Sequence, residues 1–179
     1  MTFAILIELP DSIKQELLRL CLGLSTAEWH NEENLYIVLH LFGKLTDVER
    51  WDILDRLGEI NAVPFSLKIK GLNYSPKRNH TGILSAAIET SDELNKLKKN
   101  VRSHLRSFKQ HSNENNHSNY ETIRLGTVQN ESPERMAQYF EANGEFTSSA
   151  FDVNYFIFAQ LHQTNKRSFY TVEKRYLLV

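Results

Sequence analysis

The stretch of residues 33–43 reads ENLYIVLHLFG. Its apolar run has the length of a strand rather than of a helix, and a glycine follows it directly, so residues 34–42 are predicted to form a strand. Side chains at every second position of a strand point to the same face of the sheet. Tyr36, Val38 and His40 should therefore share one face, and the predicted site depends on that face.

Outward from this strand, similar patterns predict the remaining elements. Further strands are predicted for residues 3–9, 65–70, 82–89, 120–128, 153–159 and 170–177, and helices for residues 11–22, 46–58, 91–105 and 132–142. Residues 71–80 and 109–119 are predicted to be loops, and the polar turn of residues 164–168 should join the last two strands as a hairpin.

The starts of three helices carry capping signals. Thr46 and Glu49 form a capping box, in which the hydroxyl and the carboxylate each satisfy a free backbone N–H group. Ser91 and Ser132 are residues of the type preferred at helix starts, and Pro133 occupies a first helical position, where its missing N–H costs nothing.

Apolar spacing predicts which face of two of these helices is buried. The helix that starts at Thr46 should bury Val48, Trp51, Leu54 and Leu57. The helix that starts at Ser91 should turn its leucines inward and a basic face outward. That face comprises Lys96, Lys98, Lys99, Arg102 and Arg106, which we expect to be solvated.

The elements follow one another in the order β-α-β-α-β-β-α-β-α-β-β. Strands paired by short turns and interrupted by helices indicate an α+β fold, with helices packed outside mainly antiparallel sheets. The two halves look alike, since each has a strand followed by a helix with a hydroxyl cap, at Thr46 and at Ser132. The 179 residues are predicted to form a single domain covering residues 1–179.

Composition excludes several classes of protein. The 21 basic and 22 acidic side chains almost cancel, which argues against holding nucleic acid by bulk electrostatics. No apolar run has the roughly 20 residues that a membrane span needs, so a cytoplasmic protein without membrane contact is predicted. The one cysteine, Cys21, can form neither an intramolecular disulfide nor a multi-thiolate metal site, and we expect it to be a small core residue.

Several stretches carry a resemblance to a known family. They read FAILIELP at residues 3–10, ENLYIVLHLFG at 33–43 and PFSLKIKGL at 64–72, with SPER at 132–135 and YTVE at 170–173, and Trp29 stands where the family has a tryptophan near the end of a first helical hairpin. Over nearly the whole chain, the sequence resembles the two-histidine (2H) phosphoesterase superfamily. Within it, the similarity is to 2′-5′ RNA ligases and RNA 2′,3′-cyclic phosphodiesterases.

The resemblance implies a bilobed fold, in which two pseudo-symmetric, mainly antiparallel sheets face a central cleft. Each sheet supplies one His-x-Thr motif in this family. Opening a 2′,3′-cyclic phosphate needs one imidazole to accept a proton from water and another to protonate the leaving oxygen, while hydroxyl groups hold the phosphoryl oxygens. Spacing of two on a strand places the histidine and the threonine of each motif on the same face.

This chain departs from the family at both motifs. The first aligns with Tyr36 and Val38, and the second with Thr122 and Arg124, so both catalytic histidines are missing. Losing a positioned acid or base typically lowers the rate by about 10²–10⁴. We therefore predict little or no hydrolysis by the standard mechanism.

Other residues could contribute to the site. Arg124 could bind a phosphate bidentately or form a salt bridge with a carboxylate in the cleft. Tyr36 could donate a proton but, with an ordinary phenol pKa near 10, could not act as a base at neutral pH. His40 is either a core histidine or a relocated catalytic group. A literal His-x-Thr at His162 is a chance match beside the final hairpin turn, and His80 lies in a loop.

Three functions remain open. The first, which we favour, is binding of a phosphate-bearing nucleotide or RNA end at Tyr36, His40, Thr122 and Arg124, without efficient hydrolysis. The second is an active 2′,3′-cyclic phosphate hydrolase that uses these non-standard groups, and the third is a scaffold that binds a protein partner. We expect a monomer that needs no metal and no cofactor.

Overall fold

The computed structural model describes residues 2–108, 122–164 and 167–179. The elements are β1 (Thr2–Glu8), α1 (Asp11–Leu18), β2 (Ala27–Trp29), the 3₁₀ turn η1 (Glu32–Asn34), β3 (Tyr36–Phe42), α2 (Asp47–Gly58), β4 (Phe65–Leu67), β5 (Ile69–Pro76), β6 (Thr81–Ile88), α3 (Asp92–His104), β7 (Thr122–Gln129), α4 (Pro133–Asn143), β8 (Phe151–Val153), β9 (Tyr155–Gln163) and β10 (Ser168–Leu177). The predicted α+β class is confirmed.

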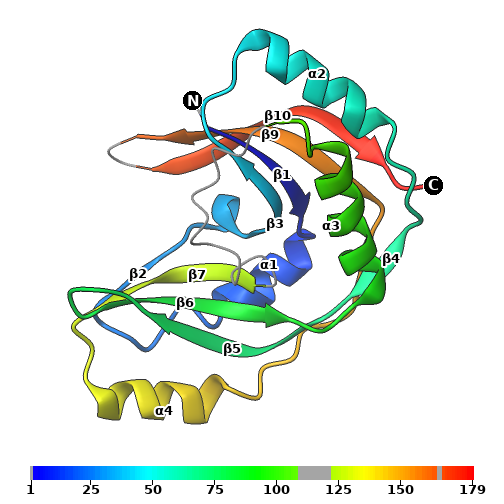
Figure 1. The fold of residues 1–179 in the computed structure, drawn as a ribbon. Helices are drawn as coiled ribbons and strands as arrows, with labels where there is room; N and C mark the ends of the chain where they lie inside the picture. The colour runs from blue at the N-terminus through cyan, green and yellow to red at the C-terminus, as the bar shows by residue number, and fades with distance from the viewer. Residues whose placement is uncertain (1, 109–121, 165–166) are drawn as a thin grey trace.

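Two antiparallel four-stranded sheets form the body of the molecule (Figure 1). Sheet 1 has the strand order β10-β9-β1-β3, and sheet 2 has the order β2-β7-β6-β5. The short strands β4 and β8 pair separately, at the end where the two sheets approach each other (Figure 1). The hairpins β9–β10 and β5–β6 lie at the opposite end of the two sheets (Figure 1).

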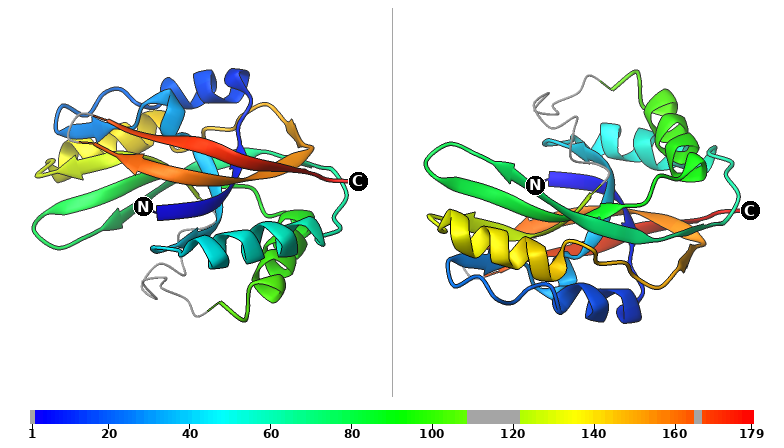
Figure 2. Two further views of the ribbon diagram at one scale, coloured as in Figure 1. Left: turned by 90° about the horizontal axis from the view of Figure 1, so that it is seen from above. Right: turned by 90° about the horizontal axis from the view of Figure 1, so that it is seen from below.

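The helices lie outside this pair of sheets (Figure 2). Apolar residues of α1, α2 and α3 pack with one face of sheet 1 in the main core, which includes Ile5, Ile37 and Phe158. Helix α4 covers the outer face of sheet 2, where Tyr139 packs in a second core cluster. The predicted placement of helices outside mainly antiparallel sheets is therefore confirmed.

The three predicted helix caps are present. Thr46 and Glu49 bond reciprocally as a capping box, with the Glu49 N–H donating to Thr46 Oγ1 over 3.3 Å and the Thr46 N–H donating to Glu49 Oε2 over 2.8 Å. Ser91 and Ser132 each accept a hydrogen bond from the backbone N–H three residues later. Local signals at these positions are enough to start a helix.

The first helix is shorter than predicted, and the described residues that follow it form no helical hairpin. Helix α1 ends at Leu18, and the chain turns at Gly23, whose φ of +90° is left-handed and suits glycine. Trp29 lies in β2, not in a helical hairpin, because residues 27–29 pair with β7. Cys21 is buried, as predicted, and burial raises the pKa of its thiol to about 11.

The predicted loop at residues 71–80 is wrong over most of its length. Residues 69–76 form β5, which pairs with β6 as a hairpin around a turn where Asn79 and His80 adopt positive φ. Strand β5 is at the edge of sheet 2 and is largely exposed, so it lacks the alternation of apolar residues that identifies a half-buried strand. The predicted strand at residues 65–70 is divided between β4 and β5, with the predicted alternation of burial retained.

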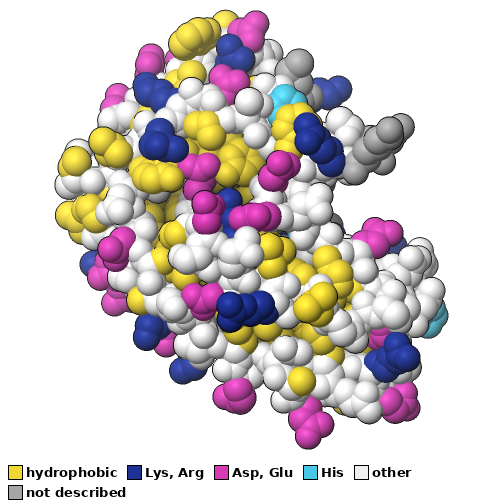
Figure 3. All heavy atoms as spheres, turned by 180° about the vertical axis from the view of Figure 1, so that it is seen from behind, with side chains coloured by type: hydrophobic (Ala, Val, Ile, Leu, Met, Phe, Trp, Pro, Cys, Tyr) yellow, Lys and Arg dark blue, Asp and Glu magenta, His cyan; other side chains and the backbone are white. Residues whose placement is uncertain are grey.

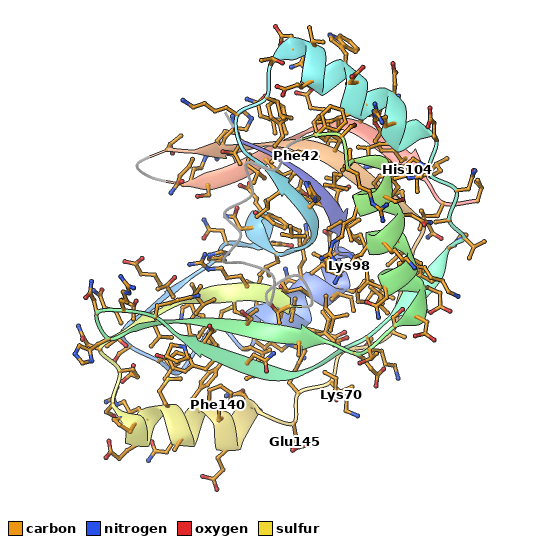
Figure 4. The ribbon with its side chains drawn as sticks, viewed as in Figure 1. Phe42, Lys70, Lys98, His104, Phe140 and Glu145 are labelled. Atoms are coloured by element: carbon orange, nitrogen blue, oxygen red, sulfur yellow. The ribbon has the colours of Figure 1, made fainter. Side chains whose placement is uncertain are left out.

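Two predicted helix faces need correction. Val48 and Trp51 are 75% and 62% exposed, because α2 turns Ile53, Leu54 and Leu57 to the core instead. Lys98 is only 5% exposed and lies on the inner side of α3 (Figure 4). It stands four residues after Leu94, which places it within the buried stripe and not on the solvated basic face.

The predicted loop at residues 109–119 and the first two residues of the predicted strand at 120–128 lie outside the described residues. No described helix has the length and apolarity needed to cross a membrane.

Candidate functional site

A cleft of about 610 Å³ lies between the two sheets at the open side of the molecule, where the surface is notched (Figure 3). Sheet 2 and the segment after β2 supply Glu28, Trp29, His30, Asn31, Asn34, Arg124 and Thr127, and sheet 1 supplies Thr2, Tyr36, Leu161, His162, Gln163, Thr164, Arg167, Ser168 and Phe169. This volume is within the range of small-molecule sites, about 300–1,000 Å³. Tyr36 and Arg124, predicted from separate motifs, thus line one cleft.

The strands that carry these two residues share an irregularity. In β3, Leu6 and Ile5 of β1 pair with Val38 and His40, so Leu39 is an extra residue that forms a β-bulge. In β7, Ser85 and Leu84 of β6 pair with Arg124 and Gly126, so Leu125 is the corresponding extra residue.

Each bulge directly follows the second position of a predicted motif, Val38 in one strand and Arg124 in the other. The match in backbone geometry is independent of side-chain identity, so it supports the alignment that equates Tyr36-x-Val38 with Thr122-x-Arg124. It also gives the two halves of the chain the pseudo-symmetry that their element order indicated.

Arg124 presents a charged group to the cleft. Its side chain is exposed, and its Nη2 donates to Thr127 Oγ1 over 2.8 Å from the same strand. Among the described carboxylates none forms an ion pair with it. The sequence left two roles open for Arg124, phosphate binding and a salt bridge within the cleft. The described residues provide no partner for the salt bridge.

Tyr36 is held as a hydrogen-bond donor. Its ring meets that of Tyr170 edge to face, with 5.6 Å between centroids, and the Tyr170 hydroxyl donates to Glu8 Oε1 over 2.8 Å. Burial raises the pKa of Tyr36, and the nearby charge of Arg124 opposes this only in part. The phenol therefore stays protonated at neutral pH, where it can donate a hydrogen bond but cannot accept a proton as a base.

His40 does not share the face of Tyr36, and this prediction is wrong. The extra residue Leu39 reverses the alternation, so Leu41 packs with Tyr36 while the His40 ring lies 4.6 Å from that of Phe42. Burial, with Arg102 of α3 nearby, lowers the pKa of His40 to about 4. His40 is not one of the described residues that line the cleft.

Val38 and Thr122 also lie outside the described lining of the cleft. Val38 is half-buried on the face of sheet 1 that carries Ala4, Leu6 and Tyr36. Thr122 is half-buried at the start of β7, opposite Ala87 of β6. Of the five residues singled out from the sequence, the structure brings together two, Tyr36 and Arg124.

Two histidines that the sequence analysis did not identify as site residues line the cleft. His30 follows β2, and its backbone N–H donates to Leu125 O over 2.7 Å, while its buried Nδ1 has no described partner. Burial, assisted by the charge of Arg124, lowers its pKa, so the ring is neutral at neutral pH. No local pattern around His30 could have indicated its position, which depends on the pairing of β2 with β7.

His162 is the other cleft histidine. Its ring is fixed in position, with Nε2 hydrogen-bonded to Thr171 Oγ1 and the ring stacked on Phe169 at 4.8 Å and 13°. From the sequence, the His-x-Thr pattern at His162 was interpreted as a chance match beside the hairpin turn. The hairpin brings it into the cleft nonetheless, on the wall opposite Arg124.

The cleft can supply hydrogen-bond donors, two guanidiniums and two imidazoles. Among the described residues no group of three or more His, Cys, Asp or Glu side chains is arranged to hold a metal ion. The arginines and amides of the lining can bind an anion, and His30, His162 and Glu28 are side chains of types that can transfer a proton.

Comparison with solved structures finds the same fold over the full chain. TT0787 of Thermus thermophilus superposes with a TM-score of 0.74 at 16% identity, covering 99% of this chain and 98% of that one. Escherichia coli LigT in complex with 3′-AMP gives 0.70 at 18% identity, covering 99% and 97%. Kluyveromyces marxianus Usb1 gives 0.52 at 10% identity, covering 94% and 96%. Comparison with protein-family profiles and with curated protein sequences finds no match.

The fold is thus that of E. coli LigT and TT0787, in agreement with the fold that the sequence resemblance implied. E. coli LigT has been solved with 3′-AMP, NADP+, ATP and phosphate. At 16–18% identity these likenesses establish the architecture of this chain.

Proposed function

We propose that this chain, built on the LigT fold, binds a nucleotide or an RNA end through a terminal phosphate in the cleft between Tyr36 and Arg124, with little or no hydrolysis. E. coli LigT, which shares the fold, holds 3′-AMP, ATP, NADP+ and phosphate. The retained cleft of about 610 Å³ has room for such a ligand.

The observation that carries the proposal is the Arg124 guanidinium, exposed in the cleft and without an ion pair among the described residues. A guanidinium offers parallel N–H donors that match the spacing of two phosphate oxygens. Its bond to Thr127 orients the group before a ligand arrives, which reduces the entropy lost on binding. The protonated Tyr36 hydroxyl supplies a further donor on the other wall.

Weak or absent hydrolysis follows from the groups at the two motif positions. Tyr36 replaces one imidazole and stays protonated, and the position of the other is occupied by Thr122, whose hydroxyl is neither an acid nor a base near neutral pH. The acid and base pair that opens a cyclic phosphate is therefore missing from the positions where the fold presents it.

A second candidate function is hydrolysis by relocated groups. His30 and His162 come from opposite walls of the same cleft, which is the arrangement that an acid and base pair requires. His162 Nε2 is already hydrogen-bonded to Thr171, and Nδ1 of His30 is buried, so this function needs the remaining ring nitrogens to reach the ligand. The scaffold alternative requires a cleft filled by side chains, and the open volume counts against it.

Calorimetric titration with 3′-AMP and a turnover assay with 2′,3′-cyclic AMP test these functions together. We expect saturable binding of 3′-AMP, about tenfold or more weakened by Arg124→Ala, and no turnover of the cyclic nucleotide. Arg106→Ala removes an exposed arginine outside the cleft and should leave binding unchanged. Turnover that His162→Gln abolishes would establish the hydrolase instead, and absence of binding to either nucleotide would leave the scaffold.

A further inference from the structure

The cleft contains a second cation, Arg167, on the wall opposite Arg124. It stands between β9 and β10, at the end of sheet 1 that borders the opening, and its side chain is exposed. Like Arg124, it forms no ion pair with any described carboxylate. The proposed phosphate site at Arg124 does not use it.

The backbone at Arg167 is fixed by the hairpin turn. The Thr164 N–H donates to Arg167 O over 2.9 Å, and the Arg167 N–H donates to Thr164 Oγ1 over 3.1 Å. The Thr164 hydroxyl donates in turn to Arg167 O over 2.9 Å. These three bonds close the end of the hairpin and set the direction in which the side chain leaves it.

The guanidinium is held as well. It lies 4.8 Å from the centroid of the Phe169 ring, and Phe169 stacks on His162 at 4.8 Å. An arginine packed on an aromatic ring keeps its planar donors available while losing little freedom on binding. Because Arg124 is tied to sheet 2 and Arg167 to sheet 1, each presents its own donors to the cleft from its own wall.

The lining between the two arginines is mostly neutral and polar. It includes the amides of Asn31, Asn34 and Gln163, and the one acidic lining residue among those described is Glu28. The cleft is therefore locally basic although the whole chain carries a formal charge of −1. A cleft with two anchored guanidiniums and a polar lining favours a dianionic ligand with separated charges over one with a single charged end.

We infer that the occupant carries two phosphate groups, one held by Arg124 and the other by Arg167, with the nucleoside portion lying between the walls. The inference rests on the proposed function and narrows its ligand to nucleotides phosphorylated at two places. Such ligands are nucleoside bisphosphates, in which the ribose separates the two groups; in nucleoside diphosphates the two phosphates are joined, so they do not fit this arrangement.

Calorimetric titration with three probes tests this inference: 3′-AMP, adenosine 3′,5′-bisphosphate and ADP. We expect the bisphosphate to bind about tenfold more tightly than 3′-AMP. Arg167→Ala should abolish that gain and leave the affinity for 3′-AMP within about twofold of the native value. Arg124→Ala should weaken both ligands. If ADP shows the gain and the bisphosphate does not, the second phosphate is adjacent to the first, and the separated arrangement is overturned.

The control is Arg106→Ala, which should change none of these affinities. Arg167→Lys keeps the charge but loses the planar fork, so it should restore only part of the gain. If 3′-AMP binds but a second phosphate adds nothing, or if Arg167→Ala weakens 3′-AMP as much as the bisphosphate, the two-phosphate inference fails while the proposed function stands. If 3′-AMP does not bind, the proposed function itself fails.

Discussion

Gly126 allows β2 to lie against β7 beside the cleft. A Cβ at this position would lie 2.5 Å from Glu28 O and 3.1 Å from the Trp29 Cα, closer than such atoms approach. Gly126→Ala should therefore lower the free energy of unfolding by about 1–3 kcal/mol, because the backbone of β2 has to move away. Since His30 follows β2 and lines the cleft, we also expect weaker binding of 3′-AMP, measured by calorimetry beside chemical denaturation.

Gly58 provides a matched control for that substitution. It is the last residue of α2, and no atom lies within 4 Å of the position that a Cβ would take. Gly58→Ala should leave 3′-AMP binding unchanged and keep or raise stability by up to about 1 kcal/mol, since alanine restricts the unfolded chain. Equal effects of the two substitutions would contradict the role of close packing at Gly126.

His40 makes stability depend on pH. Its pKa is lowered to about 4 in the folded protein, against about 6.5 when unfolded, so the unfolded chain binds the extra proton between these values. Stability is then fully present above about pH 6.5 and is lost as the pH falls toward 4. The contribution lost between pH 7.5 and pH 5 is about 2 kcal/mol.

The comparison of native protein with His40→Gln isolates the contribution of His40. His30 also has a lowered pKa, but it is present in both proteins, so its effect on stability cancels in the comparison. Chemical denaturation at pH 7.5 and pH 5 should show a smaller loss of stability for His40→Gln than for the native chain. An equal loss in the two proteins would mean that His40 is protonated as readily in the fold as out of it.

The sequence could indicate which residues belong to the two motifs. It could not indicate on which face of the sheet a residue lies once a β-bulge has interrupted the strand. Tyr36 and Arg124 both line the cleft, and each precedes the bulge in its strand. His40 was misplaced because one extra residue, Leu39, reverses the alternation, and nothing in an apolar run distinguishes a bulged leucine from a paired one. His162 was undervalued because its role in the cleft depends on where a hairpin ends.

At the scale of elements, the cap of α2 offers a local test. The reciprocal bonds between Thr46 and Glu49 satisfy backbone donors that would otherwise be free. Thr46→Ala should lower the free energy of unfolding by about 1 kcal/mol, and Thr46→Ser, which keeps the hydroxyl, should cost much less. Urea denaturation of the three proteins measures both. A cost for Thr46→Ser equal to that of Thr46→Ala would show that the lost methyl group, rather than the cap, matters.

Helix starts were predictable because their signals are local, whereas sheet edges were not. Ser91 and Ser132 each act on a backbone group three residues away, within reach of a short sequence pattern. Strand β5 pairs with β6 along most of its length and is largely exposed, so its stability comes from a neighbouring strand rather than from its own apolar pattern. Strand β2 has three residues and is likewise stabilised by its pairing with β7.

At the scale of the whole molecule, charge is balanced overall and concentrated locally. Acidic and basic side chains are interspersed over the face seen in Figure 3, in keeping with a formal net charge of −1. The two arginines in the cleft are therefore the cations that the site itself provides for an anionic ligand among the described residues. Composition could exclude bulk electrostatic binding. It could not show that two of the 21 basic residues line one cleft, because that depends on how β7 and the β9–β10 hairpin are placed in the fold.

This distribution of charge predicts that the protein binds the terminal phosphate of an RNA rather than the phosphate backbone along the strand. A short single-stranded RNA with a 3′-phosphate should bind at least about tenfold more tightly than the same RNA with a 3′-hydroxyl, because only the former brings a dianionic terminal group to Arg124. Fluorescence anisotropy with the two oligonucleotides measures the difference. The affinity should fall with salt with a slope of log K against log[salt] of about −1, since few phosphates are contacted. Equal affinity for the two ends, together with a slope several times steeper, would mean that the protein holds the backbone along its surface and that the cleft is not the site.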